Sequence, residues 1–397
     1  MDKLTVRDID VRGKRVLVRV DFNVPLDQKT ASITDDSRIR AALPTINYLV
    51  ERGARVILGS HLGRPGGKVV ENLRLAIVAR RLSQISGKQV ITASDCIGPE
   101  VEKAVQTLKN GDILLLENLR FHPEEESNDT AFARSLAGLA DIYVNDAFGT
   151  AHRKHASIVG VTEYLPAVSG LLMEKELEYL GRVSTNPIHP FGGLVGGAKV
   201  SDKVGMLENI MAGVDYLLIG GGMAATFLKA RSYDIGLSLI EADKVKTAAG
   251  LMKKALENEV KLLLPVDVVI ASEINDEAEI ETVSVEKIPP NQRIVDIGPQ
   301  TIINFSAELK KCKTIFWNGT MGIHEIAQFA VGTLAIAELL ANLEATTVIG
   351  GGSTAEAVTN MGFAEKMTFV STGGGASLKL LGGQPLPGVE ALLDRDK

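Results

Sequence analysis

Cysteine is scarce in this chain, and long apolar runs are missing. The 397 residues include two cysteines. Cys96 and Cys312 fall one in each half of the chain, so neither a disulfide framework nor a cysteine-rich metal site is indicated. No apolar run approaches the ~20 residues that a membrane-spanning helix needs. The N-terminus is charged from its second residue, which argues against a signal peptide, and we expect a cytoplasmic protein.

Positive charge is also in deficit. The formal net charge is −6 and the sequence pI is about 5.7. These values argue against a nucleic-acid partner and against binding to an anionic membrane surface. Any cluster of Arg and Lys is therefore expected to be local and to face a small anion.

One predicted helix divides the chain. Between Pro166 and Pro190, apolar residues recur at helical spacing, and residues 184–187 then end the helix. The chain has 14 glycines before residue 186 and 25 after it. At about 150 residues per domain, the length suits two or three domains. The two halves are therefore expected to be separate α/β domains, each a doubly wound, Rossmann-like parallel sheet, joined by this helix.

In the first half, apolar runs alternate with helical patterns, which is typical of a parallel sheet. The predicted strands are 16–20, 56–58, 113–116 and 142–144, and the predicted helices are 37–52, 73–85 and 129–140. Ligands of such sheets bind at the carboxyl ends of the strands. The residues that follow these strands, together with one at the start of the first helix, are Asp21, Asn23, Arg38, His61, Arg64, Arg120 and Arg153.

Four arginines in one place would repel each other, so this pattern favours an anion with several negative groups. Guanidinium groups bind phosphate and carboxylate in a bidentate manner. The alternative is that each arginine is a surface salt-bridge partner. His61 lies three residues before Arg64 and is interpreted as an anion donor, with a general base or a metal ligand as the alternatives. His122, His152 and His155 are interpreted as structural or peripheral, with a ligand role as the alternative, and Glu124–Glu126 as a solvated face.

In the second half, the residues after the predicted strands are glycine clusters. They occur at 196–197, 220–222, 319–322, 350–352 and 373–375. Glycine lets backbone N–H groups approach a phosphate, and helix N-termini favour negative charge. A single cluster would indicate only a tight turn. Lys199 and Lys203 are four residues apart, so on a helix they would point toward one phosphate chain.

These residues lie in motifs that resemble those of the phosphoglycerate kinase family. The matching stretches, in order, are RVDFNVP (19–25), DSRIRAALPTI (36–46), SHLGRP (60–65), LLLENLRFHPEEE (114–126), VNDAFGTAHRKHAS (144–157), GGAKVSDK (196–203), GGGMAATFL (220–228), WNGTMGIHE (317–325) and VSTGGGASL (370–378).

The resemblance implies two domains that face a cleft and close on their ligands. The implied boundaries are an N-terminal domain at 1–170, a linking helix at 171–185, a nucleotide domain at 186–378, and a C-terminal segment at 379–397 that returns to the first domain. It also implies the reversible transfer of the acyl phosphate of 1,3-bisphosphoglycerate to ADP, giving 3-phosphoglycerate and ATP, with Mg²⁺. We expect a monomer.

The resemblance also implies roles for individual residues. Substrate-binding residues would be Asp21, Phe22, Asn23, Arg38, His61, Leu62, Gly63, Arg64, Arg120 and Arg153. Nucleotide-binding residues would be Ala198, Lys199, Lys203, Gly222, Gly319, Glu325, Gly351, Gly352, Ser353 and Thr354. Catalytic residues would be Arg38, Lys203, Gly352, Gly374 and Gly375.

Three positions depart from the family pattern. Ser353 stands where the family usually has an Asp associated with the Mg-nucleotide, so the sequence does not assign a metal ligand. Asp202 is a possible substitute. Thr320 replaces the usual Pro and His324 the usual Phe, both near Glu325.

The chemistry requires no general base, because the carboxylate and phosphate nucleophiles are already ionised at neutral pH. Positioning and charge stabilisation remain for the protein to supply.

Two other functions fit parts of the sequence. A nucleotide-dependent dehydrogenase is suggested by the near-fingerprint Gly220, Gly222 and Ala225, but Asp243 lies in a helical pattern rather than at a strand end. A non-catalytic binder of phosphorylated solutes would usually carry an export signal.

Overall fold

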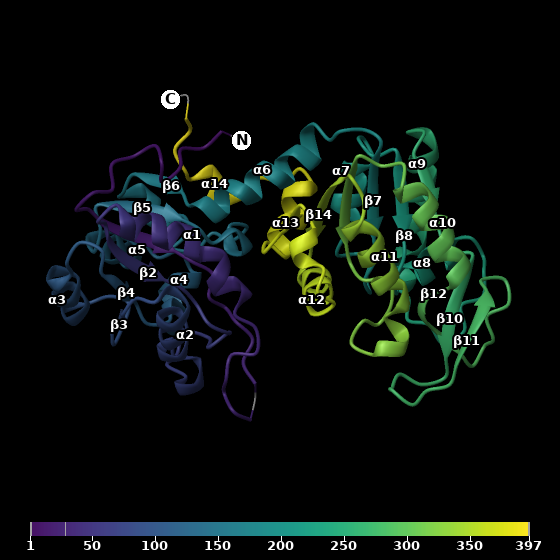
Figure 1. The fold of residues 1–397 in the computed structure, drawn as a ribbon, viewed down its shortest axis with the longest axis horizontal. Coiled ribbons are helices and arrows are strands. Elements are labelled where there is room, and N and C mark those ends of the chain that lie inside the picture. The colour runs from purple at the N-terminus through teal and green to yellow at the C-terminus, as the bar shows by residue number, and fades with distance from the viewer. Residues whose placement is uncertain (1, 28, 396–397) are drawn as a thin grey trace. The chain divides into compact units, whose positions relative to one another are not determined.

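The computed structural model describes residues 2–27 and 29–395, which form two compact units (Figure 1). The first unit contains the described residues up to Glu178 together with the segment from Pro385 onward, and the second contains Tyr179–Gln384. Within the described ranges, helices that are both long enough and apolar enough to cross a membrane do not occur.

The first unit is built on a six-stranded parallel sheet in the order β3-β4-β2-β1-β5-β6. Its strands are β1 Arg15–Arg19, β2 Arg55–Gly59, β3 Val90–Thr92, β4 Ile113–Leu115, β5 Ile142–Asn145 and β6 Ala167–Ser169. In the central strand β1, Val16 to Arg19 are all buried, as expected where helices cover both faces of a parallel sheet. Val18 of β1 pairs with Leu58 of β2 on one side and Val144 of β5 on the other.

The helices of the first unit begin and end at recognisable signals. They are α1 Ser37–Glu51, α2 Ala76–Ser86, α3 Pro99–Thr107, α4 Pro123–Glu126, α5 Thr130–Gly138, α14 Pro387–Glu390 and the first part of α6 Leu171–Thr185, which continues into the second unit from Tyr179. The Asp129 side chain caps α5 by accepting a hydrogen bond from the Phe132 amide at 2.9 Å. Gly87 ends α2 in the left-handed conformation (φ 67°). The helix predicted from residue 73 begins at Ala76, after a short 3₁₀ turn at Glu71–Leu73.

The C-terminal segment packs on the first unit. Lys3 forms an ion pair with Asp394 at 2.7 Å, and the Leu4 amide donates to the Leu393 carbonyl at 2.8 Å. The Asn145 side chain at the end of β5 donates to the Gly388 carbonyl at 3.0 Å. Both ends of the chain therefore stabilise the sheet that carries the arginines.

The second unit contains another six-stranded parallel sheet, in the order β15-β14-β13-β7-β8-β9. Its strands are β7 Phe191–Val195, β8 Tyr216–Ile219, β9 Lys261–Leu263, β13 Thr314–Asn318, β14 Thr346–Gly350 and β15 Phe369–Val370. The sheet thus confirms the second parallel-sheet α/β domain predicted from the sequence.

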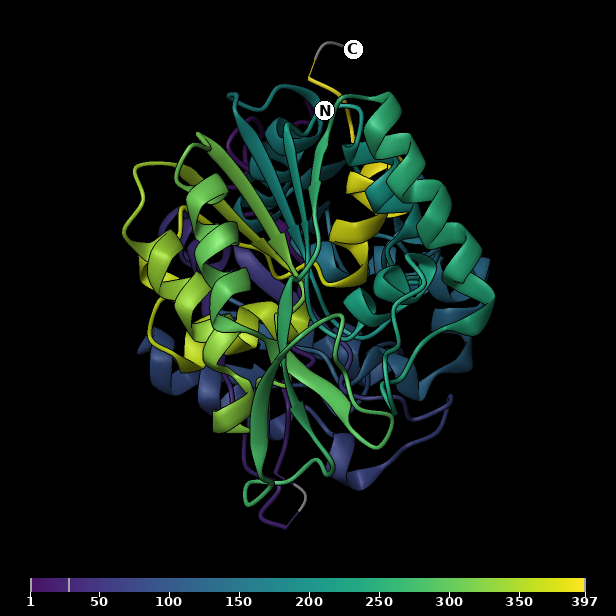
Figure 2. The ribbon, with the colours of Figure 1, turned by 90° about the vertical axis from the view of Figure 1, so that its right-hand side faces the viewer.

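Helices cover both faces of this sheet, as Figure 2 shows. They are α7 Val204–Ile210, α8 Met223–Ala230, α9 Val245–Glu257, α10 Pro299–Leu309, α11 Val331–Ala341, α12 Gly352–Asn360 and α13 Gly375–Leu381. Helix α8 packs on α9, and α10 packs on α11. Strand order runs outward from β7 in one direction and from β13 in the other, so right-handed crossovers place the two groups of helices on opposite faces.

A small antiparallel sheet in the second unit was not predicted from the sequence. It has the order β11-β10-β12 and consists of β10 Asp267–Ala271, β11 Ile280–Ser284 and β12 Arg293–Ile297. Val268 and Ile270 of β10 pack with Leu228 and Val285 in a separate small core. The strand β11 is largely exposed, so its apolar pattern is weak in the sequence.

Candidate active site

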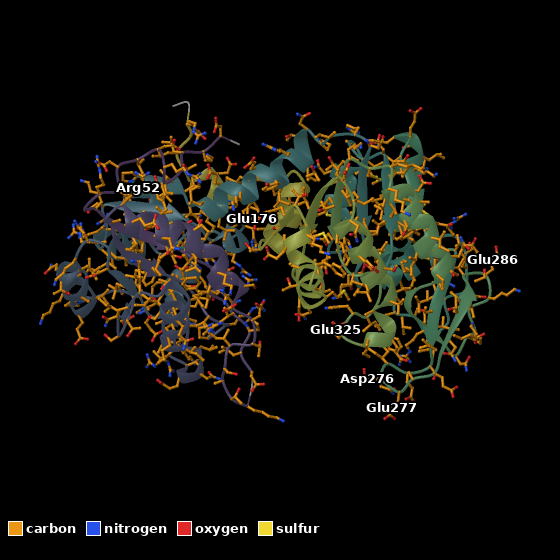
Figure 3. The ribbon with its side chains drawn as sticks, viewed as in Figure 1. Arg52, Glu176, Asp276, Glu277, Glu286 and Glu325 are labelled. Atoms are coloured by element: carbon orange, nitrogen blue, oxygen red, sulfur yellow. The ribbon has the colours of Figure 1, made fainter. Side chains whose placement is uncertain are left out.

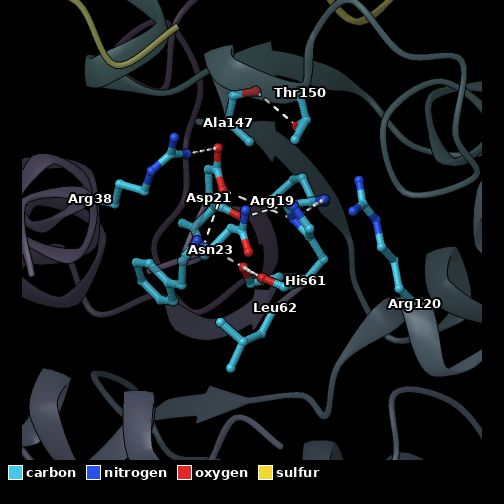
Figure 4. Close-up of polar contacts among 12 residues, drawn as sticks. Arg19, Asp21, Asn23, Arg38, His61, Leu62, Arg120, Ala147 and Thr150 are labelled. Carbon is cyan, nitrogen blue, oxygen red and sulfur yellow. Dashed lines mark hydrogen bonds and ion pairs between the residues drawn. The ribbon is translucent and has the colours of Figure 1, made fainter. Parts of the chain in front are cut away.

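The carboxyl ends of β1, β2 and β4 bring the predicted anion-binding residues of the first unit together (Figure 4). Asp21 and Asn23 follow β1, His61 follows β2, and Arg120 follows β4. Arg38 comes from the first turn of α1. In a doubly wound sheet, this edge is where ligands bind.

Asp21 joins two of these groups. Its carboxylate forms an ion pair with Arg38, and its Oδ1 lies 4.0 Å from His61 Nδ1. Burial has the largest single effect on the pKa of Asp21 and raises it, but the charges of Arg38 and Arg19, with the Asn23 amide, together lower that pKa below its usual range. Asp21 therefore stays ionised and holds the Arg38 guanidinium in place.

His61 is neutral at physiological pH. Burial, with the charges of Arg19 and Arg120, lowers its pKa well below the usual value, although Asp21 acts in the opposite direction. Arg19 Nη2 lies 3.3 Å from His61 Nδ1. Because a guanidinium can only donate, Nδ1 must accept, and the ring proton then resides on Nε2. His61 thus offers one N–H donor, in agreement with its interpretation as an anion donor.

The loop after β2 is fixed by hydrogen bonds to its neighbours. Asn23 Oδ1 accepts from the Gly63 amide at 2.8 Å, and Arg120 Nη1 donates to the Gly63 carbonyl at 3.1 Å. The Leu62 carbonyl accepts from Asn118 Nδ2 at 2.8 Å. The Phe22 amide donates to Ser60 Oγ at 2.9 Å, with the Phe22 ring fully buried. Phe22, Leu62 and Gly63 are therefore parts of the framework.

The remaining two predicted arginines are less constrained. Arg153 is half-buried, and its charge helps to lower the pKa of His155 to about 4, after burial and the charges of Arg120 and Arg19. Arg64 is exposed on the loop after β2. Among described residues, the structure gives Arg64 no hydrogen bond or ion pair, so the surface salt-bridge alternative does not apply to it.

Sequence reasoning missed Arg19 and Glu125, which form a buried chain of contacts. Arg19 Nε donates to Ser157 Oγ at 2.8 Å, and Ser157 Oγ donates to Glu125 Oε1 at 2.6 Å. Arg19 and Glu125 are 1% and 0% exposed. Interpreting Glu124–Glu126 as a solvated face was therefore wrong for its central residue. No local signal marked Glu125, because its burial depends on Ser157, 32 positions away.

In the second unit, a buried lysine lies where the strand order reverses. Strands β7 and β13 are neighbours, and their connections run in opposite directions along the sheet, which is the usual ligand position in this fold. Lys203 Nζ donates to the Gly196 carbonyl after β7 and to the Asn318 carbonyl at 3.1 Å at the end of β13. Burial lowers the pKa of Lys203 to about 8.

Glycine is required next to this lysine. Gly319 has φ +98°, and a Cβ there would lie 2.2 Å from the Gly196 carbonyl oxygen and 2.4 Å from Lys203 Nζ. Its amide donates to Thr354 Oγ1 at 2.6 Å, which links β13 to the first turn of α12. Gly319 thus allows the strand ends and the lysine to approach closely.

Two other glycines have no such internal reason, since an added Cβ at Gly352 or Gly375 would meet nothing within 4 Å. Gly374 also has open space around it, but it lies at φ +50°. Gly352 and Gly375 are the first residues of α12 and α13, where the backbone N–H groups lack partners within the helix. Gly351, before α12, needs glycine for its φ of +89°. The open space before these amides suits the approach of a ligand.

Several residues predicted to bind the nucleotide, and the metal candidate Asp202, are exposed. They are Ala198, Lys199, Asp202, Gly222, Glu325 and Ser353. The helical-turn argument for Lys199 and Lys203 was wrong, because α7 begins only at Val204. Glu325 lies on the loop between β13 and α11 (Figure 3), with 69% of its side chain exposed and 3.2 Å from His324 Nδ1. Asp202 belongs to no cluster of metal-binding side chains in the described part of the chain.

Comparisons with known proteins place the chain in one family. The phosphoglycerate kinase family model matches residues 6–384. The chain belongs to the phosphoglycerate kinase family. It is 58% identical over 395 residues to the phosphoglycerate kinase of Pelotomaculum thermopropionicum, and 54% identical to that of Moorella thermoacetica, with 100% of both chains covered in each case.

Solved structures agree with the sequence comparison. The phosphoglycerate kinase of Coxiella burnetii superposes with a TM-score of 0.87 at 40% identity, covering 98% of both chains. That of Pyrococcus horikoshii gives the same TM-score at 33% identity. The resemblance seen in the sequence is confirmed, and the chain is a kinase of glycolysis. Neither the dehydrogenase nor the non-catalytic binder is supported.

Proposed function

We propose that the first unit binds 3-phosphoglycerate or 1,3-bisphosphoglycerate and that the second binds ADP or ATP. The observation that carries this division is the cationic cluster at the strand ends of the first unit. Asp21 pairs with Arg38, and Glu126 pairs with Arg120 at 3.4 Å, but Arg64 and Arg153 have no ion pair among the described residues, so an excess of positive charge remains. A small ligand with both a carboxylate and a phosphate supplies the missing negative charge.

In the first unit, we assign each substrate contact from the donor and acceptor atoms of the predicted residues. Arg38 and Arg120 donate to the substrate's anionic groups, as does Nε2 of His61. Asp21 and Asn23 are acceptors for its hydroxyl group. Arg64 and Arg153, being less constrained, move to the substrate phosphate on binding.

On the nucleotide side, we propose that backbone amides carry most of the recognition. The first turn of α12, Gly352–Thr354, receives the phosphates, and Gly351 shapes its approach. Gly222, Ala198 and Lys199 line the nucleoside end, Gly319 keeps the Lys203 pocket open, and exposed Glu325 accepts from the ribose. Mg²⁺, when bound with the nucleotide, neutralises phosphate charge. Ser353 and Asp202 are exposed oxygen donors and fit an ion held mainly by phosphates and water.

We propose that catalysis rests on charge stabilisation by residues of both units. The attacking carboxylate or phosphate oxygen needs no base, and no side chain must move a proton. Arg38 and Lys203 stabilise charge on the transferring phosphoryl group, together with the amides at Gly352, Gly374 and Gly375. Glu125 and Ser157 hold Arg19, which in turn fixes the tautomer of His61. We propose a monomeric, cytoplasmic enzyme.

A coupled assay tests the reaction directly. The purified chain, supplied with 1,3-bisphosphoglycerate, ADP and Mg²⁺, should form ATP, and the reverse reaction should consume it. Separate titrations with 3-phosphoglycerate and ADP should each give saturable binding. The Arg38→Ala and Arg120→Ala variants should bind 3-phosphoglycerate more weakly and ADP normally. Unchanged affinity for 3-phosphoglycerate in both variants would contradict the proposed division of ligands.

A further inference from the structure

Outside the proposed active site, three side chains with metal-binding atoms meet in the first unit. They are Asp95 and Cys96, on the segment between β3 and α3, and His122, between the 3₁₀ turn Leu119–Phe121 and α4. One ligand atom from each lies within 4.8 Å of the other two. His122 Nε2 is 2.7 Å from Asp95 Oδ1.

The three donors form a set that discriminates between metals. A thiolate and an imidazole suit Zn²⁺ and Co²⁺, whereas Mg²⁺ prefers oxygen ligands alone. Zinc sites bring sulfur and nitrogen to about 2.0–2.3 Å from the ion, so ligand atoms a few ångströms apart can surround it after small side-chain adjustments. Three protein ligands leave one tetrahedral position for water.

The three side chains of the cluster differ in exposure to solvent. Cys96 is fully buried, while the side chains of His122 and Asp95 are 27% and 49% exposed. The Asp95 carboxylate is oriented by the Cys96 amide, which donates to Oδ1 at 2.6 Å. The His122 ring packs on Phe132 with centroids 5.3 Å apart. Asp95 and His122 are therefore accessible to an ion from solvent, whereas the Cys96 thiol becomes accessible only when these side chains move.

We propose that Asp95, Cys96 and His122 form a binding site for a divalent ion of the zinc type. The ion replaces the hydrogen bond between Asp95 and His122, and the imidazole proton passes through solvent from Nε2 to Nδ1. The thiol proton is released to solvent, and a water molecule completes the coordination. The competing explanation is a hydrogen-bonded cluster that only stabilises the loop after β3.

The site lies close in sequence to the proposed active site, since His122 is two residues from Arg120. Its existence does not depend on the function proposed above. Metal binding can therefore be tested in the intact chain without any substrate.

Cobalt gives the sharpest test, because a cobalt–thiolate bond has a charge-transfer absorption that other ligands lack. The full-length protein is titrated with Co²⁺ in excess Mg²⁺, and Zn²⁺ is then added to displace the Co²⁺. We expect one equivalent to bind with the thiolate band. The band should disappear in Cys96→Ser, and affinity should fall at least about tenfold in His122→Asn.

The chain supplies a matched control, since its second cysteine lies in the other unit. Cys312 is also buried, and its Sγ donates to the Glu308 carbonyl at 3.5 Å. Cys312→Ser should retain the band and the stoichiometry. Circular dichroism and metal-free thermal unfolding identify variants that fail to fold. No saturable thiolate band in the wild type, or an undiminished band in Cys96→Ser, would overturn the proposal.

Discussion

Each unit is built on a six-stranded parallel sheet, but the two sheets differ in strand order and in what they place at the strand ends. The first unit presents charged side chains, of which several are held by neighbours, as Arg38 is by Asp21 and Arg19 by Ser157. The second presents backbone amides, with Lys203 the buried cation at the reversal of strand order.

This difference suits the two proposed ligands. A small glycerate phosphate offers little surface beyond its charges, so recognition depends on oriented guanidinium groups. A nucleotide has a long phosphate chain that helix N-termini can follow. Side-chain truncation should therefore damage the first unit's function most, and backbone crowding the second unit's function.

The largest expected effect is from removing the arginine closest to the proposed chemistry. Arg38→Ala should lower kcat about 10²–10³-fold, the usual loss when one donor to transition-state charge is removed. ADP affinity should change little. Steady-state kinetics and calorimetry with ADP measure the two quantities.

Arg40 provides the matched control on the same helix. It is exposed and forms an ion pair with Asp36 at 2.8 Å. Arg40→Ala should leave kcat within about twofold, since exposed ion pairs contribute little. Equal losses in both variants would indicate a general effect on α1 rather than a role for Arg38.

The arginines were found from the sequence because each follows an apolar run directly, and parallel strands bring their ends together. Glu125 could not be found in this way. It lies in a run of three acidic residues, and its burial depends on Ser157, which is 32 positions away. Similarly, the exposed strand β11 pairs with β10 without a clear apolar alternation of its own. Contacts between residues far apart in the sequence therefore determine both the burial of Glu125 and the formation of β11.

The converse prediction concerns the backbone of the second unit. Gly352→Ala adds a methyl group where the protein itself has open space, so the fold should tolerate it. The methyl group should block the approach of a phosphate and weaken ADP binding roughly tenfold, or about 1.4 kcal/mol. Gly250 of α9, which also has open space, is the control. An unchanged ADP affinity in Gly352→Ala would remove the α12 amides from the proposed site.

The two sides should also respond differently to pH. Arginines stay charged throughout the accessible range, whereas burial lowers the pKa of Lys203 to about 8. As pH rises through about 8, free protein loses this charge, and ADP affinity should fall by at most about tenfold per pH unit. Affinity for 3-phosphoglycerate should stay level. Calorimetry from pH 7 to 9.5 measures both, and Lys203→Arg should flatten the ADP profile. A matching decline for both ligands would contradict the assignment.

The smallest expected effect is from Glu125→Gln, which tests whether the function of the first unit depends on hydrogen bonds that fix its arginines. Glu125→Gln keeps the shape of the side chain but removes the charge opposite Arg19. The free energy of unfolding should fall by about 1–3 kcal/mol, the range for hydrogen bonds to charged groups. Affinity for 3-phosphoglycerate should fall a few-fold, because Arg19 no longer fixes the His61 tautomer, while ADP affinity stays the same. Glu124→Gln, on the exposed side of the same turn, should change neither quantity. Lost stability with unaltered glycerate affinity would make Glu125 a purely structural residue, and the orientation of Arg19 would then have to come from Val20 and Ser157 alone.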